Sequence, residues 1–191
     1  MRLLGIITAL FALCYPHQVS SQSQSQACNS IVTKDLLACA SDKLKKADAH
    51  LNSNYRKALA LLPAKKPTLK EAQISWLSFR DEYCQDIYTE TLPGNEADIE
   101  RTLCLALLTS DRAAEIERLY TSSQDREFYR AVSALERAGY DRAELMGKLK
   151  NSASQDQKWS RYVSQNCELQ GQVKKENEDN CKARTNFNRS Y

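Results

Sequence analysis

The 191-residue sequence has little of what interrupts a helix, since it contains only five glycines and four prolines. These two residues are the least favourable ones in a helix interior. Alanine, leucine, lysine and glutamate, which favour helices, are abundant instead. The composition therefore predicts an all-α protein.

Residues that build metal and catalytic sites are also scarce. No two cysteines stand two to four residues apart, and His50 is the only histidine after residue 21. A closed zinc site starts from such a local pair of ligands, so we expect neither a metal nor another cofactor. No motif surrounds His50, and we expect it at an exposed helix position. Paired carboxylates such as Asp81 and Glu82 are common on helical surfaces, so the sequence does not predict an enzyme.

Strong charge and long apolar runs are absent as well. The formal net charge of +3 is too small to predict binding to nucleic acid. The apolar run that follows Arg2 is about a dozen residues long, whereas a membrane-spanning helix needs about 20. One positive charge before such a run is typical of a secretory signal peptide. We predict a signal peptide over residues 1–21 with cleavage after Ser21, and cleavage after Ala27 is the weaker alternative.

Lipidation of Cys14, at the end of the apolar run, is another interpretation of this N-terminus. It requires a small residue immediately before the cysteine, and Leu13 is not small. The Ser- and Gln-rich residues 22–27 are too polar to pack and predict a flexible lead. The sequence thus predicts a periplasmic or secreted protein.

Loss of the signal peptide would remove one cysteine and leave six, an even number in an exported chain. This is typical of a disulfide framework. The six are Cys28, Cys39, Cys84, Cys104, Cys167 and Cys181.

Apolar residues recur at three- and four-residue steps from Thr33 up to Pro63. This spacing predicts one long amphipathic helix with Thr33 as its N-cap. Thr68 and Glu71 have the spacing of a capping box, in which each side chain satisfies a free backbone N–H at the start of a helix. A second helix is therefore expected from Thr68 to Leu92.

Pro93 and Gly94 end the second helix, and Asn95 is expected to cap a third one that reaches about residue 120. Two antiparallel helices place residues equidistant from their turn side by side. Cys84 and Cys104 each lie about ten residues from this turn, so we predict a disulfide between them. Closing such a loop stabilises a fold by about 3 kcal/mol.

The remaining cysteines are paired by the same reasoning. Cys28 and Cys39 are close in sequence, so the segment before the first helix can fold back onto its first turns. Cys167 and Cys181 are expected to pair across a turn near Gly171.

The C-terminal part is similar to a degenerate copy of the first part. Tyr55-Arg56-Lys57-Ala58 resembles Tyr129-Arg130-Ala131-Val132, and Trp76-x-x-Phe79-x-x-x-x-Cys84 has the spacing of Trp159-x-x-Tyr162-x-x-x-x-Cys167. Chance similarity between helical stretches is the alternative. We predict a disulfide-stapled helical hairpin or three-helix domain over residues 28–120, followed by a helical partial repeat over residues 121–191.

Three motifs within the first domain are recognisable together. They are Asp48-x-x-Leu51-Asn52-x-x-Tyr55, Gln73-x-x-Trp76-x-x-Phe79-Arg80-Asp81-x-x-Cys84 and Cys104-x-x-x-Leu108-Thr109-x-x-Arg112. Residues 28–120 thereby resemble the N-terminal domain of the LprI-type lysozyme inhibitor family, small exported helical domains of bacteria. The resemblance implies a protein that inhibits lysozyme by binding to it.

The motif residues are interpreted as a structural network that sets the register of the three helices, and an anion or sugar site is the alternative. They are Asp48, Asn52, Tyr55, Trp76, Arg80, Asp81, Thr109 and Arg112. A guanidinium group suits a carboxylate, so Arg112 is expected to pair with Asp48 or Asp81. The aromatic residues at helical spacing are expected in the core rather than on a recognition surface.

One charge feature stands out in residues 81–100, which contain seven carboxylates and no lysine or arginine. The carboxylates are Asp81, Glu82, Asp86, Glu90, Glu96, Asp98 and Glu100. This acidic tip of the hairpin can be a solvated end, with carboxylates favourably placed at the start of a helix. It can also be a docking surface for a basic partner such as an animal lysozyme, with Glu90, Asn95, Glu96 and Asp98 as the candidate contacts.

The sequence therefore predicts an exported protein that binds a protein partner and inhibits lysozyme-like muramidases stoichiometrically. A structural or interaction protein of the cell envelope with an unrelated partner is the alternative. The sequence makes no prediction of the oligomeric state.

Overall fold

A computed structural model describes residues 28–123, 125–152 and 156–189. All the regular elements in these residues are helical, as predicted. They are α2 (Thr33–Leu61), the short 3-10 helix η1 (Pro63–Lys65), α3 (Lys66–Thr91), α4 (Ala97–Tyr120), α5 (Arg126–Arg137), α6 (Arg142–Asn151), α7 (Gln157–Lys174) and α8 (Glu178–Arg189). The predictions for residues 1–27, including the signal peptide, its cleavage sites, lipidation of Cys14 and the flexible lead, lie outside the described residues.

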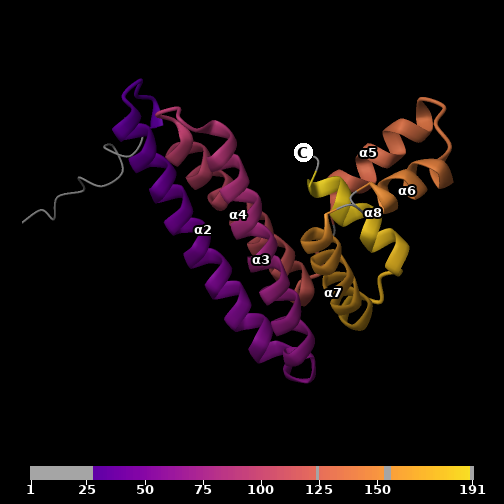
Figure 1. Cartoon of the computed structure of the whole chain (residues 1–191). Helices are drawn as coiled ribbons and strands as arrows, with labels where there is room; N and C mark the ends of the chain where they lie inside the picture. Colours follow the sequence, from indigo (N-terminus) through magenta and orange to yellow (C-terminus); the bar gives the residue numbers. More distant parts are fainter. Residues whose placement is uncertain (1–27, 124, 153–155, 190–191) are drawn as a thin grey trace, which may run out of the picture.

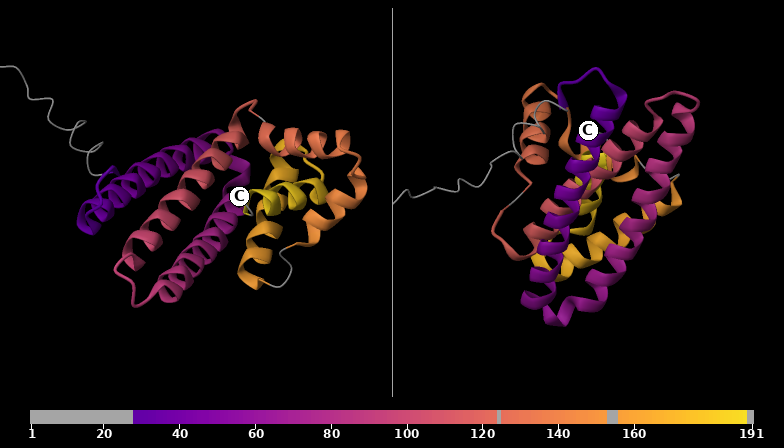
Figure 2. Two further views of the ribbon diagram at one scale, coloured as in Figure 1. Left: turned by 90° about the horizontal axis from the view of Figure 1, so that it is seen from above. Right: turned by 90° about the vertical axis from the view of Figure 1, so that its left-hand side faces the viewer.

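The helices form two groups. The long helices α2, α3 and α4 lie along one another, and α4 packs against both α2 and α3 (Figure 1). The shorter helices α5 to α8 form the second group, in which α6 packs against α8. This group joins the first through α7, which packs against α3 (Figure 2).

The main hydrophobic core is shared by the two groups. Its buried members are Leu51, Ala58, Leu69, Ala72, Trp76, Phe79, Ala113, Ile116, Leu119, Trp159, Tyr162, Val163, Cys167, Leu169 and Cys181. Trp76, Phe79 and Trp159 are at most 5% exposed, so these aromatic residues belong to the core as expected. Tyr83, which was expected there too, is 37% exposed, so that part of the prediction is wrong. A smaller cluster around Phe128 and Val132 holds α5 against α6 and α8.

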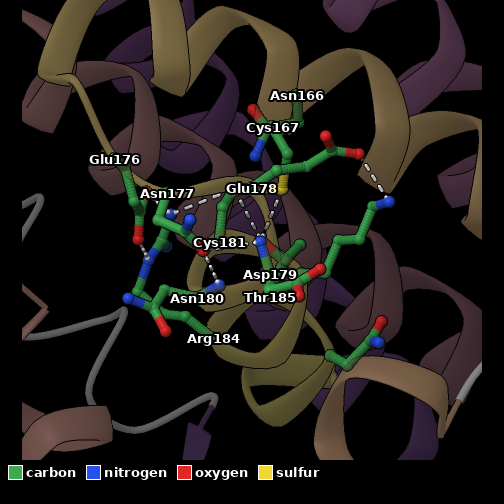
Figure 3. Close-up of a disulfide and its surroundings, with 12 residues drawn as sticks. Asn166, Cys167, Glu176, Asn177, Glu178, Asp179, Asn180, Cys181, Arg184 and Thr185 are labelled. Atoms are coloured by element: carbon green, nitrogen blue, oxygen red, sulfur yellow. Dashed lines mark hydrogen bonds and ion pairs between the residues drawn. A yellow bond between two sulfur atoms is a disulfide. The ribbon is translucent and has the colours of Figure 1, made fainter. Parts of the chain in front are cut away.

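The three disulfides are the pairs expected from the sequence. Cys28 is bonded to Cys39, Cys84 to Cys104 and Cys167 to Cys181, with Cα–Cα distances of 5.2, 5.6 and 5.6 Å. The second joins α3 to α4 and the third joins α7 to α8 (Figure 3). These two therefore cross-link consecutive helices, whereas the first ties Cys28, which precedes α2, to the second turn of that helix.

The expected caps of the first two helices are wrong by one or two residues. Thr33 is the first residue of α2 rather than its cap, and the Ser30 hydroxyl accepts from the backbone N–H of Val32 at 3.0 Å and donates to Asp35 at 2.9 Å. α3 begins at Lys66, two residues before the expected capping box, and no side chain caps it. Pro67 is tolerated there because a first-turn N–H has no partner within the helix anyway.

Asn95 does not cap α4, because Glu96 occupies the N-cap position and makes no side-chain capping bond. The turn is closed by backbone hydrogen bonds instead, from the Gly94 N–H to the Thr91 oxygen at 2.8 Å and from the Ala97 N–H to the Gly94 oxygen at 3.3 Å. Asp98 lies in the first turn of α4, where its negative charge offsets the helix dipole.

Replacing Gly94 with alanine is expected to lower the free energy of unfolding by about 1–3 kcal/mol. A Cβ atom at this position would lie 2.8 Å from the backbone oxygen of Thr91, so the turn would have to move. Urea denaturation measures the loss. Gly147→Ala is the matched control, since its helical position has open space around it. A Gly94→Ala protein as stable as the unsubstituted one would contradict the close contact.

Candidate partner-binding surface

The acidic tip is formed by the second half of α3, the α3–α4 turn and the first turn of α4. All seven of its carboxylate residues are exposed, and so is Asn95 in the turn. The four candidate contact residues Glu90, Asn95, Glu96 and Asp98 therefore lie at one end of the helical hairpin, next to the turn that joins its two helices.

Most of the charge of the tip is not neutralised locally. Asp81 pairs with Arg80 at 2.7 Å, and Glu82 pairs with Lys158 of α7. The other five carboxylates have no lysine or arginine within 4.0 Å among the described residues: Asp86, Glu90, Glu96, Asp98 and Glu100. The end of the hairpin thus presents five unpaired negative charges to solvent.

A groove of about 1020 Å³ begins at the tip and is lined by α2, α3 and α4 and by Asn188 and Arg189 of α8. Glu100 belongs to both features, and the exposed Leu107 is one of the apolar residues that line the groove. His50 lines the α2 side and is exposed, as expected, with its Nε2 atom 3.1 Å from Asn54 Nδ2. The groove is lined by basic, acidic and apolar side chains, which suits contact with a protein surface.

Four other motif residues surround Arg80. Its guanidinium donates two hydrogen bonds to Asp81 Oδ1 and one to Thr109 Oγ1, at 2.7 to 3.1 Å. It also lies 4.9 Å above the Trp76 ring and 3.9 Å from Asp48 Oδ1. Because α2, α3 and α4 each contribute, this arginine links the three helices of the first group.

Arg112 does not pair with Asp48 or Asp81, so that prediction is wrong. Its guanidinium is buried on the side of α4 that faces α7, and its Nη1 atom donates to Glu115 at 2.8 Å. The same atom donates to Asn166 at 2.8 Å and to the hydroxyl of Tyr162 at 3.2 Å. The carboxylates expected as partners are held by Arg80, on another face of the bundle.

Glu115 is the electrostatic partner that fixes this second cluster. Burial by itself would raise its pKa, but the charges of Arg112 and Arg184 lower the pKa from 4.5 to about 2. The hydroxyl of Tyr162 donates to Glu115, and burial and this carboxylate raise the pKa of Tyr162. At neutral pH the cluster is therefore a buried ion pair held by neutral hydrogen-bonding groups.

The other two motif residues of α2 lie elsewhere. Asn52 is exposed and takes no part in either cluster, whereas Tyr55 packs against the main core. The buried polar residue of α2 is Asn54, which donates to the Ala113 oxygen at 3.0 Å and accepts from the Tyr120 hydroxyl at 2.9 Å. Its place on the helical face of Leu51 was the signal that could have identified it.

Sequence reasoning also missed Arg189. It follows Cys181 by eight residues, the same spacing as between Cys104 and Arg112. Each arginine packs against an aromatic ring of the other half. Arg112 lies 5.3 Å from the ring of Tyr162, and Arg189 lies 5.2 Å from the ring of Phe79. Phe79 and Tyr162 occupy equivalent positions of the two repeated motifs, which extends the predicted repeat into α8.

Two kinds of feature are absent from the described residues. No helix among them is long and apolar enough to cross a membrane. No cluster of three or more His, Cys, Asp or Glu side chains in the described part of the chain could hold a metal ion.

Comparison with known proteins gives two similarities. The model of a family described as lysozyme inhibitor LprI matches residues 23–116. An uncharacterized protein of Rhizobium meliloti (strain 1021) is 30% identical in an alignment of 128 residues that covers 59% of this chain and 92% of that protein. No solved structure matches the chain significantly. The family match covers α2, α3 and most of α4, and it ends before α5.

Proposed function

Because the chain belongs to the LprI lysozyme inhibitor family through its residues 23–116, we propose that it is an exported protein that inhibits lysozyme-like muramidases by stoichiometric binding. The three disulfides support a place in an oxidising compartment, the periplasm or the exterior of the cell. The protein acts by occupying the enzyme rather than by catalysis, and it needs no cofactor.

The acidic tip is the proposed binding surface for the enzyme. Its five unpaired carboxylates lie at an exposed helix end, where they attract a basic enzyme from a distance. Asn95 offers an uncharged hydrogen-bonding group between Glu90 and Glu96. The groove that starts at Glu100 adds apolar contact area beside the charged end, so charge guides the encounter and the groove contributes to the stability of the complex.

A turbidity assay tests the inhibition. Protein comprising residues 22–191, oxidised and checked for helical content by circular dichroism, is mixed with a basic animal lysozyme and bacterial cell walls. We expect clearing of the walls to slow in proportion to added protein and to stop changing near one molecule per enzyme molecule. Unchanged clearing at micromolar concentrations of folded protein would remove lysozyme as the target.

The part of the chain after residue 120 favours a second candidate function. Helices α5 to α8 lie outside the family match and add a surface of their own. In this alternative the protein is a structural or interaction protein of the envelope whose partner is unrelated to lysozyme. A pull-down from periplasmic extract, with residues 22–191 as bait, separates the two functions by whether a muramidase is recovered.

A further inference from the structure

A cavity of about 330 Å³ lies where the C-terminal end of α4 meets α5, α7 and α8. Its charged and amide-bearing lining residues are Arg118, Asp125, Gln170, Lys174, Glu176 and Arg184. All of them follow residue 116, so the cavity is outside the family match and distant in sequence from the acidic tip. Its volume is at the lower end of the range for ligand sites, which favours a small ligand.

Arg184 is the most buried charged residue of this lining, at 3% exposed. Its Nε and Nη2 atoms each donate to the carboxylate of Glu176 at 2.9 Å, the pairing that Figure 3 shows beside the α7–α8 disulfide. Its Nη1 atom is buried and has no hydrogen-bond partner among the described residues. Asp125 Oδ2 lies 3.7 Å from Nη1, which is too long for a hydrogen bond.

Two further groups at the cavity are also left without hydrogen bonds. Arg118 Nη2 lies 3.8 Å from the same oxygen of Asp125, which already accepts from Asn188 Nδ2 at 2.7 Å. Gln170 is 3% exposed, and its side-chain amide makes no hydrogen bond within the described part of the chain. Buried polar groups are nearly always satisfied, so the buried Nη1 atom of Arg184, which has no hydrogen-bond partner among the described residues, indicates a missing acceptor. The guanidinium of Arg118, whose side chain is 23% exposed, and the amide of Gln170 lie at the same cavity and can donate to that acceptor.

The charged residues that line the cavity indicate whether that acceptor is negatively charged. Three cations, Arg118, Lys174 and Arg184, face two carboxylates, Asp125 and Glu176. Two guanidinium groups and an amide can donate together to the oxygen atoms of a single anion. We propose that this cavity binds a small oxyanion, a phosphate group or a carboxylate, held by Arg118, Gln170 and Arg184.

Calorimetry and thermal unfolding of the oxidised protein test this proposal, with sodium phosphate and sodium acetate as probes. Sodium chloride keeps the ionic strength constant in every sample, so screening does not change. We expect saturable binding and a melting temperature that rises with the concentration of at least one probe. Preference for phosphate assigns a phosphate site, and preference for acetate assigns a carboxylate site. No saturable effect of either probe beyond the chloride control would overturn the proposal.

Two variants localise the binding. Gln170→Met removes the amide at similar size, and Arg118→Gln removes one cation; each is expected to weaken binding about tenfold, the effect of losing one charge-assisted hydrogen bond. Arg161→Gln is the matched control, because it removes the same charge from an exposed position of α7 away from the cavity. Equal anion affinity in Arg118→Gln, Arg161→Gln and the unsubstituted protein would show that the bound anion lies elsewhere.

Discussion

Replacing Glu115 with glutamine is expected to lower the free energy of unfolding by about 3–5 kcal/mol. Glu115 is 6% exposed and accepts hydrogen bonds from Arg112 at 2.8 Å and from Asn166 at 2.6 Å. The substitution preserves size but leaves the guanidinium of Arg112, which is 1% exposed, without its counter-charge. An uncompensated buried charge is among the costliest changes in a protein interior, because its solvation by water is lost.

Urea denaturation at neutral pH measures this loss. Glu117→Gln is the matched control, since Glu117 lies on the same helix, is only half-buried and forms no ion pair with a described residue. Its effect should stay within about 0.5 kcal/mol. A loss below about 1 kcal/mol in Glu115→Gln would mean that the neutral partners of Arg112 satisfy it by themselves.

The same carboxylate predicts how stability depends on pH. Its pKa is lowered from 4.5 to about 2 in the folded protein, so folding favours the ionised form. The resulting stabilisation is complete above about pH 4.5 and is lost progressively as the pH falls toward 2. Denaturation midpoints between these pH values should fall less steeply in Glu115→Gln than in the unsubstituted protein. Parallel curves would assign the acid sensitivity to other groups.

Neutralising the acidic tip is expected to weaken inhibition by slowing association about tenfold or more at low salt. The variant combines Glu90→Gln, Glu96→Gln and Asp98→Asn, which keep size while removing three exposed charges. Long-range attraction acts before contact, so the on-rate should fall more than the off-rate rises. Stability should change little, although the loss of Asp98 removes a few tenths of a kcal/mol of favourable interaction with the start of α4.

Surface binding kinetics with immobilised lysozyme measure both rates. Raising the salt concentration from 0.1 to 1 M shortens the Debye length from about 10 to 3 Å. The association rate of the unsubstituted protein should therefore fall, and that of the triple variant should change much less. The control variant combines Glu71→Gln, Glu127→Gln and Glu168→Gln, three exposed carboxylates outside the tip. It has the same net charge as the tip variant. Equal association rates for the two variants would place the binding surface away from the hairpin end.

Local features of the sequence determined the helical class, the order of the long helices and the three disulfides. Hairpin reasoning gave the right pairs because each cysteine pair lies within a short stretch of chain. The repeated Trp-aromatic-Cys spacing was readable for the same reason. Hairpin reasoning misplaced the last turn, because Gly171 lies inside α7 and the chain turns at residues 175–177. The caps at Thr68 and Asn95 could not be predicted in this way. Pro67 allowed α3 to begin before Thr68, and a backbone turn replaced the side-chain cap expected from Asn95.

Tertiary structure alone decided the partners of the buried polar groups. The three motifs placed Arg112 among carboxylates of the first three helices, yet its contacts include Tyr162 and Asn166 of α7, which are 50 and 54 residues away in sequence. Asn52 and Asn54 differ by two positions on α2 and face opposite environments, which depends on how α4 lies against that helix. A guanidinium specifies what kind of group it needs, but the packing of distant helices determines which carboxylate is within reach.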